Sequence, residues 1–103
     1  MLRFLRSLWP RRAMDRLHFV LYTRRNCHLC VDALLHLQKE QRRHGFELHI
    51  IDVDSDQSLA AKLGEMVPVV AVNGQVRLWG NINPVLLTRL LRGEARKNIR
   101  DQP

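Results

Sequence analysis

The sequence is poor in the residues that build cross-linked or membrane-embedded proteins. It has two cysteines in 103 residues, and they lie only three positions apart, at Cys27 and Cys30. A loop this short lowers the entropy of the unfolded chain very little, so the pair is a poor structural staple. No uninterrupted apolar run approaches the ~20 residues that a helix needs to cross a bilayer. Arg3 and Arg6 interrupt the apolar start of the chain, so we expect no secretory signal and a cytoplasmic location.

Aromatic residues are also scarce, at 6% of the chain, although the net charge of +7 at first favours a nucleic-acid partner. The excess positive charge lies at the two ends, because the segment 17–91 contains eight basic and seven acidic residues. A nucleic-acid-binding domain usually carries its basic stripe on the folded surface, often beside aromatic side chains that stack on bases. We therefore expect a nearly neutral folded domain and no nucleic-acid partner.

The segment between the basic ends alternates between β-rich apolar runs and stretches of helical spacing. With an apolar fraction of 46%, the chain has enough material for one domain with one hydrophobic core. The expected elements, in chain order, are a strand over 17–23, a helix beginning near Cys27, a strand over 46–53, a short helix ending at Gly64, a strand over 67–72, a strand over 75–79 and a helix over 84–92. This order, β-α-β-α-β-β-α, predicts an α/β fold with a four-stranded mixed sheet flanked by helices.

Asparagine and glycine mark the turns between these elements. Asn73-Gly74 is a strong hairpin signal, because both residues accept the positive φ of a type I′ turn. We expect Asn26 to cap the first helix and Gly45 to end it, and we expect Gly93 to end the last helix. The chain then divides into a basic N-terminal extension (1–16), a folded domain (17–92) and a polar basic tail (93–103). We expect residues 1–13 and 95–103 to contribute little to stability and nothing to the thiol chemistry, because charged segments without an apolar period bury little surface.

The two cysteines form a Cys-x-x-Cys motif at the point where a predicted strand is followed by a predicted helix. A thiol at a helix N-terminus faces unpaired backbone N–H groups and the positive end of the helix dipole, and both favour the thiolate. Arg24 and Arg25 add positive charge nearby. We therefore predict that Cys27 is the attacking thiol. Cys30 lies one turn further along, on the face that Leu34 and Leu37 mark as buried, which suits the second attack that resolves a mixed disulfide.

Several features together resemble the glutaredoxin and thioredoxin family, in particular the compact glutaredoxin-like proteins of bacteria. They are the strand–Cys-x-x-Cys–helix opening, the Val67-Pro68 step before a strand, the Asn73-Gly74 hairpin and the glycine after it, Gly80. The resemblance covers about residues 17–92. It implies a thioredoxin-like fold, a cis peptide bond at Val67-Pro68 beside the cysteines, and a bound peptide or glutathione that pairs with the backbone of Val67. The chain departs from the family pattern between its cysteines, where it has His28-Leu29.

These observations predict a thiol–disulfide oxidoreductase that reduces or exchanges disulfides in a protein or a small thiol. The expected catalytic residues are Cys27 and Cys30, and the expected substrate-binding residues are Val67, Pro68, Arg25 and Gly80. Arg24 and Arg25 are both candidates to pair with a carboxylate of the substrate. Electrons are expected from glutathione or from a reductase, with the protein acting as a monomer and without a metal or organic cofactor. Two cysteines are too few for a zinc site, and the histidines lack the spacing of metal ligands.

Two other functions remain open on the sequence alone. One is a thioredoxin-like binding module whose groove holds a partner with little turnover, and the other is an interaction protein whose basic ends contact nucleic acid or an anionic membrane. Turnover of a model disulfide separates the enzyme from the binding module, and salt-sensitive binding by the two ends identifies the interaction protein.

Overall fold

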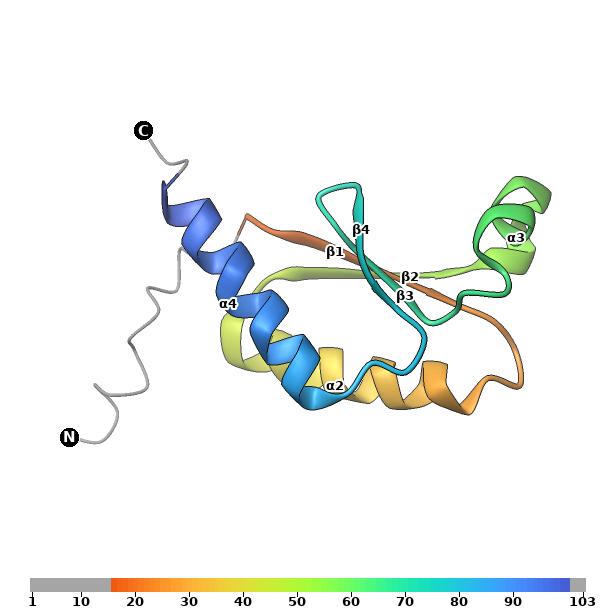
Figure 1. Cartoon of the computed structure of the whole chain (residues 1–103), viewed down its shortest axis with the longest axis horizontal. Helices are drawn as coiled ribbons and strands as arrows, with labels where there is room; N and C mark the ends of the chain where they lie inside the picture. The colour runs from red at the N-terminus through yellow and green to blue at the C-terminus, as the bar shows by residue number, and fades with distance from the viewer. Residues whose placement is uncertain (1–15, 101–103) are drawn as a thin grey trace.

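The computed structural model of this protein describes residues 16–100 (Figure 1). The predicted basic extension therefore lies almost entirely outside the described residues, as do residues 101–103. The elements, in chain order, are β1 (His18–Thr23), α2 (His28–His44), β2 (Glu47–Asp52), the 3-10 helix η2 (Val53–Ser55), α3 (Gln57–Leu63), β3 (Val69–Val72), β4 (Gln75–Trp79) and α4 (Pro84–Arg100). Every strand and helix expected from the sequence is present.

The four strands form one mixed sheet in the order β2-β1-β3-β4. β1 runs parallel to β2 and antiparallel to β3, and β3 pairs antiparallel with β4. Helices α2 and α4 lie on one side of this sheet, while α3 lies beyond the carboxyl end of β2 (Figure 1). The predicted α/β fold with a four-stranded mixed sheet and flanking helices is confirmed.

The hydrophobic core lies between the sheet and the two long helices. Phe19 and Leu21 alternate with outward-facing residues along β1, and both are fully buried. The ring of Phe19 packs on that of Phe46, with 4.2 Å between the ring centroids. The other members of this core cluster are Leu17, Ala33, Leu37, Val70, Val72, Ile82, Leu87, Leu91 and Ala95. Burial of these side chains holds α2 against the sheet.

The expected end of the last helix at Gly93 is wrong. Asn83 caps α4 as its position indicated, since its Oδ1 accepts a hydrogen bond of 2.9 Å from the N–H of Leu86. However, α4 continues through Gly93 to Arg100, and Ala95 is fully buried in the core. Part of the predicted polar tail is therefore helix that packs on the domain. Burial of one small side chain outweighs the modest helix penalty of an exposed glycine.

The Asn73-Gly74 hairpin forms as predicted, with φ of 49° at Asn73 and 85° at Gly74. Asn73 also fastens the start of β1. Its backbone N–H donates to the carbonyl of His18 at 2.9 Å, and its side-chain Oδ1 accepts from the N–H of His18 at 2.9 Å. The turn that joins β3 to β4 therefore holds the first residue of β1 through two hydrogen bonds.

Candidate functional site

The segment between β1 and α2 changes direction at Asn26, which has a left-handed φ of 59°. Asparagine tolerates this conformation because its short polar side chain fits it with little steric cost. The predicted N-cap at Asn26 is wrong by one residue. Cys27 is the N-cap of α2, with extended backbone angles of φ −113° and ψ 98°. The turn at Asn26 therefore places the first cysteine itself at the helix N-terminus.

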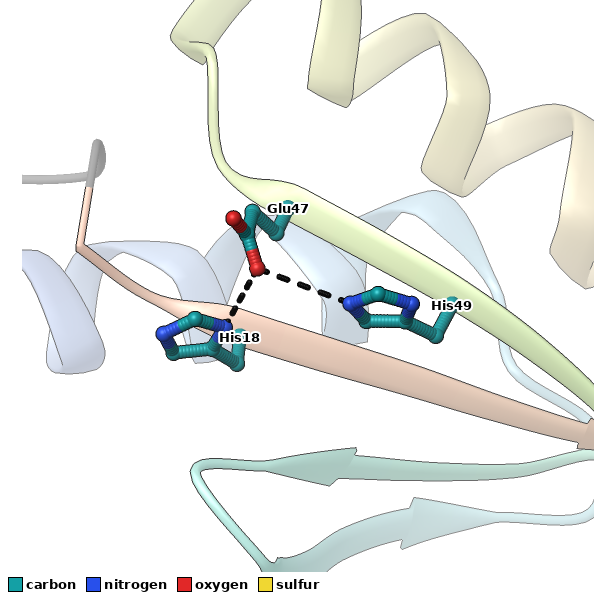
Figure 2. Close-up of side chains that lie close together, drawn as sticks. All are labelled: His18, Glu47 and His49. Atoms are coloured by element: carbon teal, nitrogen blue, oxygen red, sulfur yellow. Dashed lines mark ion pairs between the residues drawn. The ribbon is translucent and has the colours of Figure 1, made fainter.

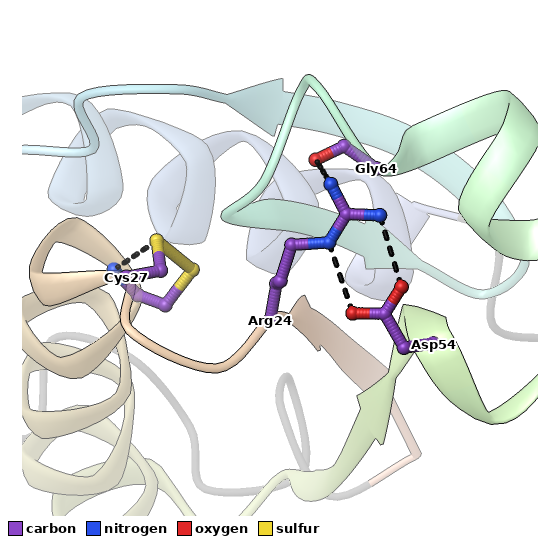
Figure 3. The surroundings of a disulfide bond; sticks show 5 residues. Arg24, Cys27, Asp54 and Gly64 are labelled. Atoms are coloured by element: carbon purple, nitrogen blue, oxygen red, sulfur yellow. Dashed lines mark hydrogen bonds and ion pairs between the residues drawn. A yellow bond between two sulfur atoms is a disulfide. The ribbon is translucent and has the colours of Figure 1, made fainter.

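Cys27 and Cys30 form a disulfide, with their Cα atoms 5.2 Å apart. The N–H of Cys30 donates to Sγ of Cys27 at 3.2 Å, so the cysteine side chain occupies the capping position (Figure 3). Cys27 is half-buried, whereas Cys30 is 3% exposed on the core side of α2. The expectation that Cys30 is the more protected of the two is confirmed. An N–H directed at sulfur stabilises negative charge there when the pair is reduced.

Arg24 does not extend toward the cysteines. Its guanidinium donates to both carboxylate oxygens of Asp54 at 3.0 Å and to the carbonyl of Gly64 at 3.1 Å (Figure 3). The hydrogen bond from Arg24 lowers the pKa of Asp54 below its usual value, and the same pair raises the pKa of Arg24. Arg24 is therefore a structural tie between the loop before Cys27 and the segment around α3, and Asp54 balances its charge. Arg24 therefore does not give Cys27 the expected support, while Arg25 lines the groove beside Cys27.

An open groove with a volume of about 590 Å³ lies beside the two cysteines. Its walls are formed by Thr23, Arg24, Arg25, Asn26, Cys27, His28, Cys30, Val31, Leu34 and Ile50. Arg25 is exposed at this groove, as a residue that binds substrate must be. Val31 is 55% exposed and Ile50 is 50% exposed, so the groove also offers apolar surface. Sequence reasoning missed Val31 and Ile50 as site residues, because an apolar residue in a predicted helix or strand carries no local signal that distinguishes a groove from the core.

The Val67-Pro68 peptide bond is cis, as the family resemblance implied. Tyr22 pairs with Val69 in the sheet, so this step lies at the same end of the sheet as the start of α2. Gly80 joins it there, because its N–H donates to the carbonyls of Met66 and Pro68 at 3.2 and 2.9 Å. These three predicted substrate-binding residues lie on the β3 side of β1 and do not line the groove beside β2.

Among residues 16–100, the side chains of His18, Glu47 and His49 lie close enough together to hold a metal ion, and this group does not include a cysteine. It lies at the amino ends of β1 and β2, away from Cys27. Among residues 16–100, no helix has both the length and the apolar character that crossing a membrane requires.

A comparison with protein families identifies the domain. A family model described as a glutaredoxin-like domain (DUF836) matches residues 18–92. The chain belongs to this family. No curated protein sequence matches this glutaredoxin-like protein.

Solved structures with the same fold come from several organisms. A solution structure of a protein from Nitrosomonas europaea is 23% identical with a TM-score of 0.63, covering 75% of this chain and 93% of that one. An X-ray structure of a protein from X. campestris is 26% identical with a TM-score of 0.62, covering 73% of this chain and 96% of that one. Oxidized mitochondrial thioredoxin 3 from Saccharomyces cerevisiae is 20% identical with a TM-score of 0.59, covering 89% of each chain. These neighbours establish the thioredoxin-like fold of the glutaredoxin-like protein.

Proposed function

We propose that this glutaredoxin-like protein is a dithiol oxidoreductase that reduces or exchanges disulfides in a protein or a small thiol. The observation that carries the proposal is the position of Cys27 as the N-cap of α2, where the N–H of Cys30 donates to its sulfur. In general, a cysteine at a helix N-terminus has a lowered thiol pKa, and so a larger fraction of it is the reactive thiolate. Cys30, buried and one turn away, is within reach for the bond that closes the cycle.

The proposed reaction begins with the thiolate of Cys27 attacking one sulfur of a substrate disulfide. A Cys27–substrate disulfide forms, the substrate S–S bond breaks, and the leaving sulfur takes up a proton. The thiol of Cys30 then loses its proton and attacks Sγ of Cys27. This step releases the second substrate thiol, which is protonated in turn, and leaves the Cys27–Cys30 disulfide. Two electrons pass from the protein to the substrate, and glutathione or a reductase resupplies them.

The groove and the segment containing the cis-proline supply two surfaces for the substrate. Arg25 pairs with a carboxylate on the substrate, and Val31 and Ile50 contact its apolar atoms. On the other side of the cysteines, the backbone of Val67 next to Pro68 pairs with an extended peptide or with glutathione, and Gly80 holds that segment in place. The reaction takes place without a resident metal or organic cofactor.

Reduction of a small neutral disulfide by the full chain tests this proposal, with a thiol donor resupplying electrons. We expect Cys27→Ser to lower the rate to that of the donor alone. We expect Cys30→Ser to accumulate a mixed disulfide on Cys27 that mass spectrometry detects. A serine substitution is close in size to cysteine, so circular dichroism and thermal melting of both variants serve as the check on folding.

The outcome distinguishes the enzyme from a binding module. If the wild-type protein reduces the disulfide no faster than the donor alone, the enzymatic proposal is wrong. If Cys27→Ser retains activity while Cys30→Ser loses it, the order of the two thiols is reversed. Limiting iodoacetamide gives a second measurement of this order, because Cys27 of the reduced protein should be alkylated before Cys30.

A further inference from the structure

Three side chains with metal-binding atoms meet at the end of the sheet opposite to the cysteines. His18 begins β1, while Glu47 and His49 lie at the start of β2. Parallel pairing places His18 directly opposite Glu47. His49 lies two residues after Glu47, so its side chain lies on the same face of the sheet. The two imidazoles thus flank the carboxylate, one from its own strand and one from the neighbouring strand (Figure 2).

The ligand atoms are already close to the spacing that a metal ion requires. Nδ1 of His18 lies 2.6 Å from Oε2 of Glu47, and Nε2 of His49 lies 3.5 Å from the same oxygen. All three ligand atoms lie within 4.8 Å of one another. An ion that binds nitrogen and oxygen at ~2.0–2.2 Å in tetrahedral geometry separates its ligand atoms by about 3.4 Å. Small side-chain rotations therefore suffice to bring all three atoms onto one ion.

The backbone beneath these side chains is firmly held. Asn73 binds both the N–H and the carbonyl of His18, and the N–H of Glu47 donates to the carbonyl of Leu17 at 3.0 Å. The side chains themselves are open to solvent, with exposed fractions of 57% for His18, 56% for Glu47 and 62% for His49. A rigid sheet with accessible side chains reduces the ordering cost that an ion must overcome on binding.

We propose that His18, Glu47 and His49 form a binding site for a divalent transition-metal ion of the zinc class, with water in the fourth position. Two imidazole nitrogens and one carboxylate oxygen form a donor set that suits Zn²⁺, whereas Mg²⁺ and Ca²⁺ prefer oxygen ligands. Three protein ligands with one open position are a common arrangement around zinc. The ion joins the start of β1 to the start of β2, and both strands must be folded and paired to bind it.

This site is separate from the thiol chemistry. Five residue steps along β1 separate His18 from Thr23, which corresponds to about 16 Å at ~3.3 Å per residue. Binding to the folded chain alone raises its stability by mass action. The proposal therefore predicts a metal-dependent rise in melting temperature that does not depend on the redox activity of the protein.

The test is calorimetric titration of Zn²⁺ into the full chain, free of any affinity tag and with the Cys27–Cys30 disulfide intact. The disulfide matters because reduced thiols bind zinc themselves. We expect one ion per chain, and a rise in melting temperature when Zn²⁺ is present. Loss of a residue that only orients a metal ligand lowers affinity by about 10- to 100-fold, so Glu47→Gln and His49→Ala should each lower it by at least roughly tenfold. His36→Ala, which removes a histidine from α2, is the matched control and should bind Zn²⁺ like the wild type.

Melting curves in a chelator establish that each variant is folded before titration. If Glu47→Gln and His49→Ala bind Zn²⁺ as tightly as the wild type, or if His36→Ala loses as much affinity as they do, the proposal is overturned. Zinc binding that appears only after reduction assigns the ion to the cysteines and overturns it as well. Titration of Mg²⁺ tests the donor chemistry, and binding of Mg²⁺ as tight as that of Zn²⁺ would contradict the assigned metal class.

Discussion

At the carboxyl end of β1 the two cysteines are half-buried or buried, whereas at its amino end the two histidines and the glutamate are exposed. Cys30 is 3% exposed beside the half-buried Cys27, while His49 on the neighbouring strand has a side chain that is 62% exposed. Cys27 and Cys30 are close because they lie three positions apart at the start of one helix. The imidazoles and the carboxylate are close because β1 and β2 pair in register. Local helix geometry thus creates one site and tertiary register creates the other.

The two ends of β1 also differ in their closure, by which we mean the contact that joins each end to a segment far away in the sequence. At the carboxyl end, Arg24 ties the loop before Cys27 to Asp54 and Gly64. At the amino end, Ala95 of α4 is buried in the same core cluster as Leu17, the residue before β1. A polar tie is directional and exposed, and an apolar contact is not, so the two closures should respond differently to substitution and to pH. Four predictions test this contrast.

The largest expected effect is at the apolar closure. Ala95→Asp places a carboxylate where the native side chain is fully buried, and we expect a loss of about 3 kcal/mol or more in the free energy of unfolding. The matched control is Arg96→Asp, which introduces the same side chain at the next, exposed position. Its cost should remain below about 1 kcal/mol, mainly from an acid near a helix C-terminus. Equal losses in urea melts would mean that the end of α4 does not pack on the domain.

Glycine-to-alanine substitutions at one position near each closure add a single methyl group and so allow the two closures to be compared. A Cβ at Gly64 would lie 2.5 Å from the carbonyl oxygen of Ala60 and 2.5 Å from Nη2 of Arg24. Gly64→Ala should therefore lower the free energy of unfolding by about 1–3 kcal/mol. At Gly93, within α4, a Cβ meets nothing within 4 Å. Gly93→Ala should stabilise the helix by about 0.5–1 kcal/mol. Chemical denaturation measures both, and a destabilised Gly93→Ala would refute the helical extension.

A smaller effect is expected on substrate choice at the carboxyl end. Because Arg25 is exposed at the groove, Arg25→Glu should raise KM for an acidic peptide disulfide by about two- to fivefold, as for other exposed charge pairs. KM for a neutral disulfide should not change, and high salt should remove the difference. Arg42→Glu makes the same charge reversal near the far end of α2. If both variants raise KM equally, the effect is long-range attraction and Arg25 has no direct role.

The smallest effects concern pH, and they fall in different windows at the two ends. The pKa of Asp54 is lowered mainly by its hydrogen bond from Arg24. Its folded-state pKa is below the unfolded value, so its contribution is present above about pH 4 and is lost as pH falls through the folded pKa. The pKa of His44, near the amino end of β2, is lowered mainly by burial. Its contribution is present above about pH 6.5 and is lost as pH falls below that value.

Urea midpoints measured from pH 8 to pH 3 separate the two windows. Asp54→Asn should flatten the part of the curve near and below about pH 4, and His44→Gln should flatten the part below about pH 6.5. Each variant should leave the other window unchanged. If the urea midpoint of Asp54→Asn falls below about pH 4 as steeply as that of the wild type, the hydrogen bonds from Arg24 to Asp54 contribute nothing to stability.

Much of the fold follows from local patterns in the sequence. The glycines and asparagines at the turns, above all Asn73-Gly74, place the element boundaries, because few other residues accept those backbone angles. The protection of Cys30 also follows from its place one turn after Cys27. The end of α4 does not follow, because Gly93 is a local signal for helix termination, and the burial of Ala95 against residues far away in the sequence overrides it.

The parts that sequence could not predict depend on contacts between segments far apart in the chain. Arg24 was expected to support Cys27 electrostatically, and its partner Asp54 lies thirty positions away. The histidines lacked metal spacing along the chain, yet parallel register sets His18 opposite Glu47. Such juxtapositions depend on which strands pair and in which register, and neither is encoded in any short stretch of residues.

The register between β3 and β4 slips at one point, where Val70 pairs with Leu78 but Ala71 pairs with Val76. Arg77 is therefore the extra residue on β4, an outer strand of the sheet. Its Nε lies 3.9 Å from Oε2 of Glu94, so this charged side chain turns back toward α4. Open strand edges invite other chains to add to the sheet, and a bulge with an inward-turned charge makes such an edge a poor template. The irregularity thus disfavours the pairing of another strand with the β4 edge.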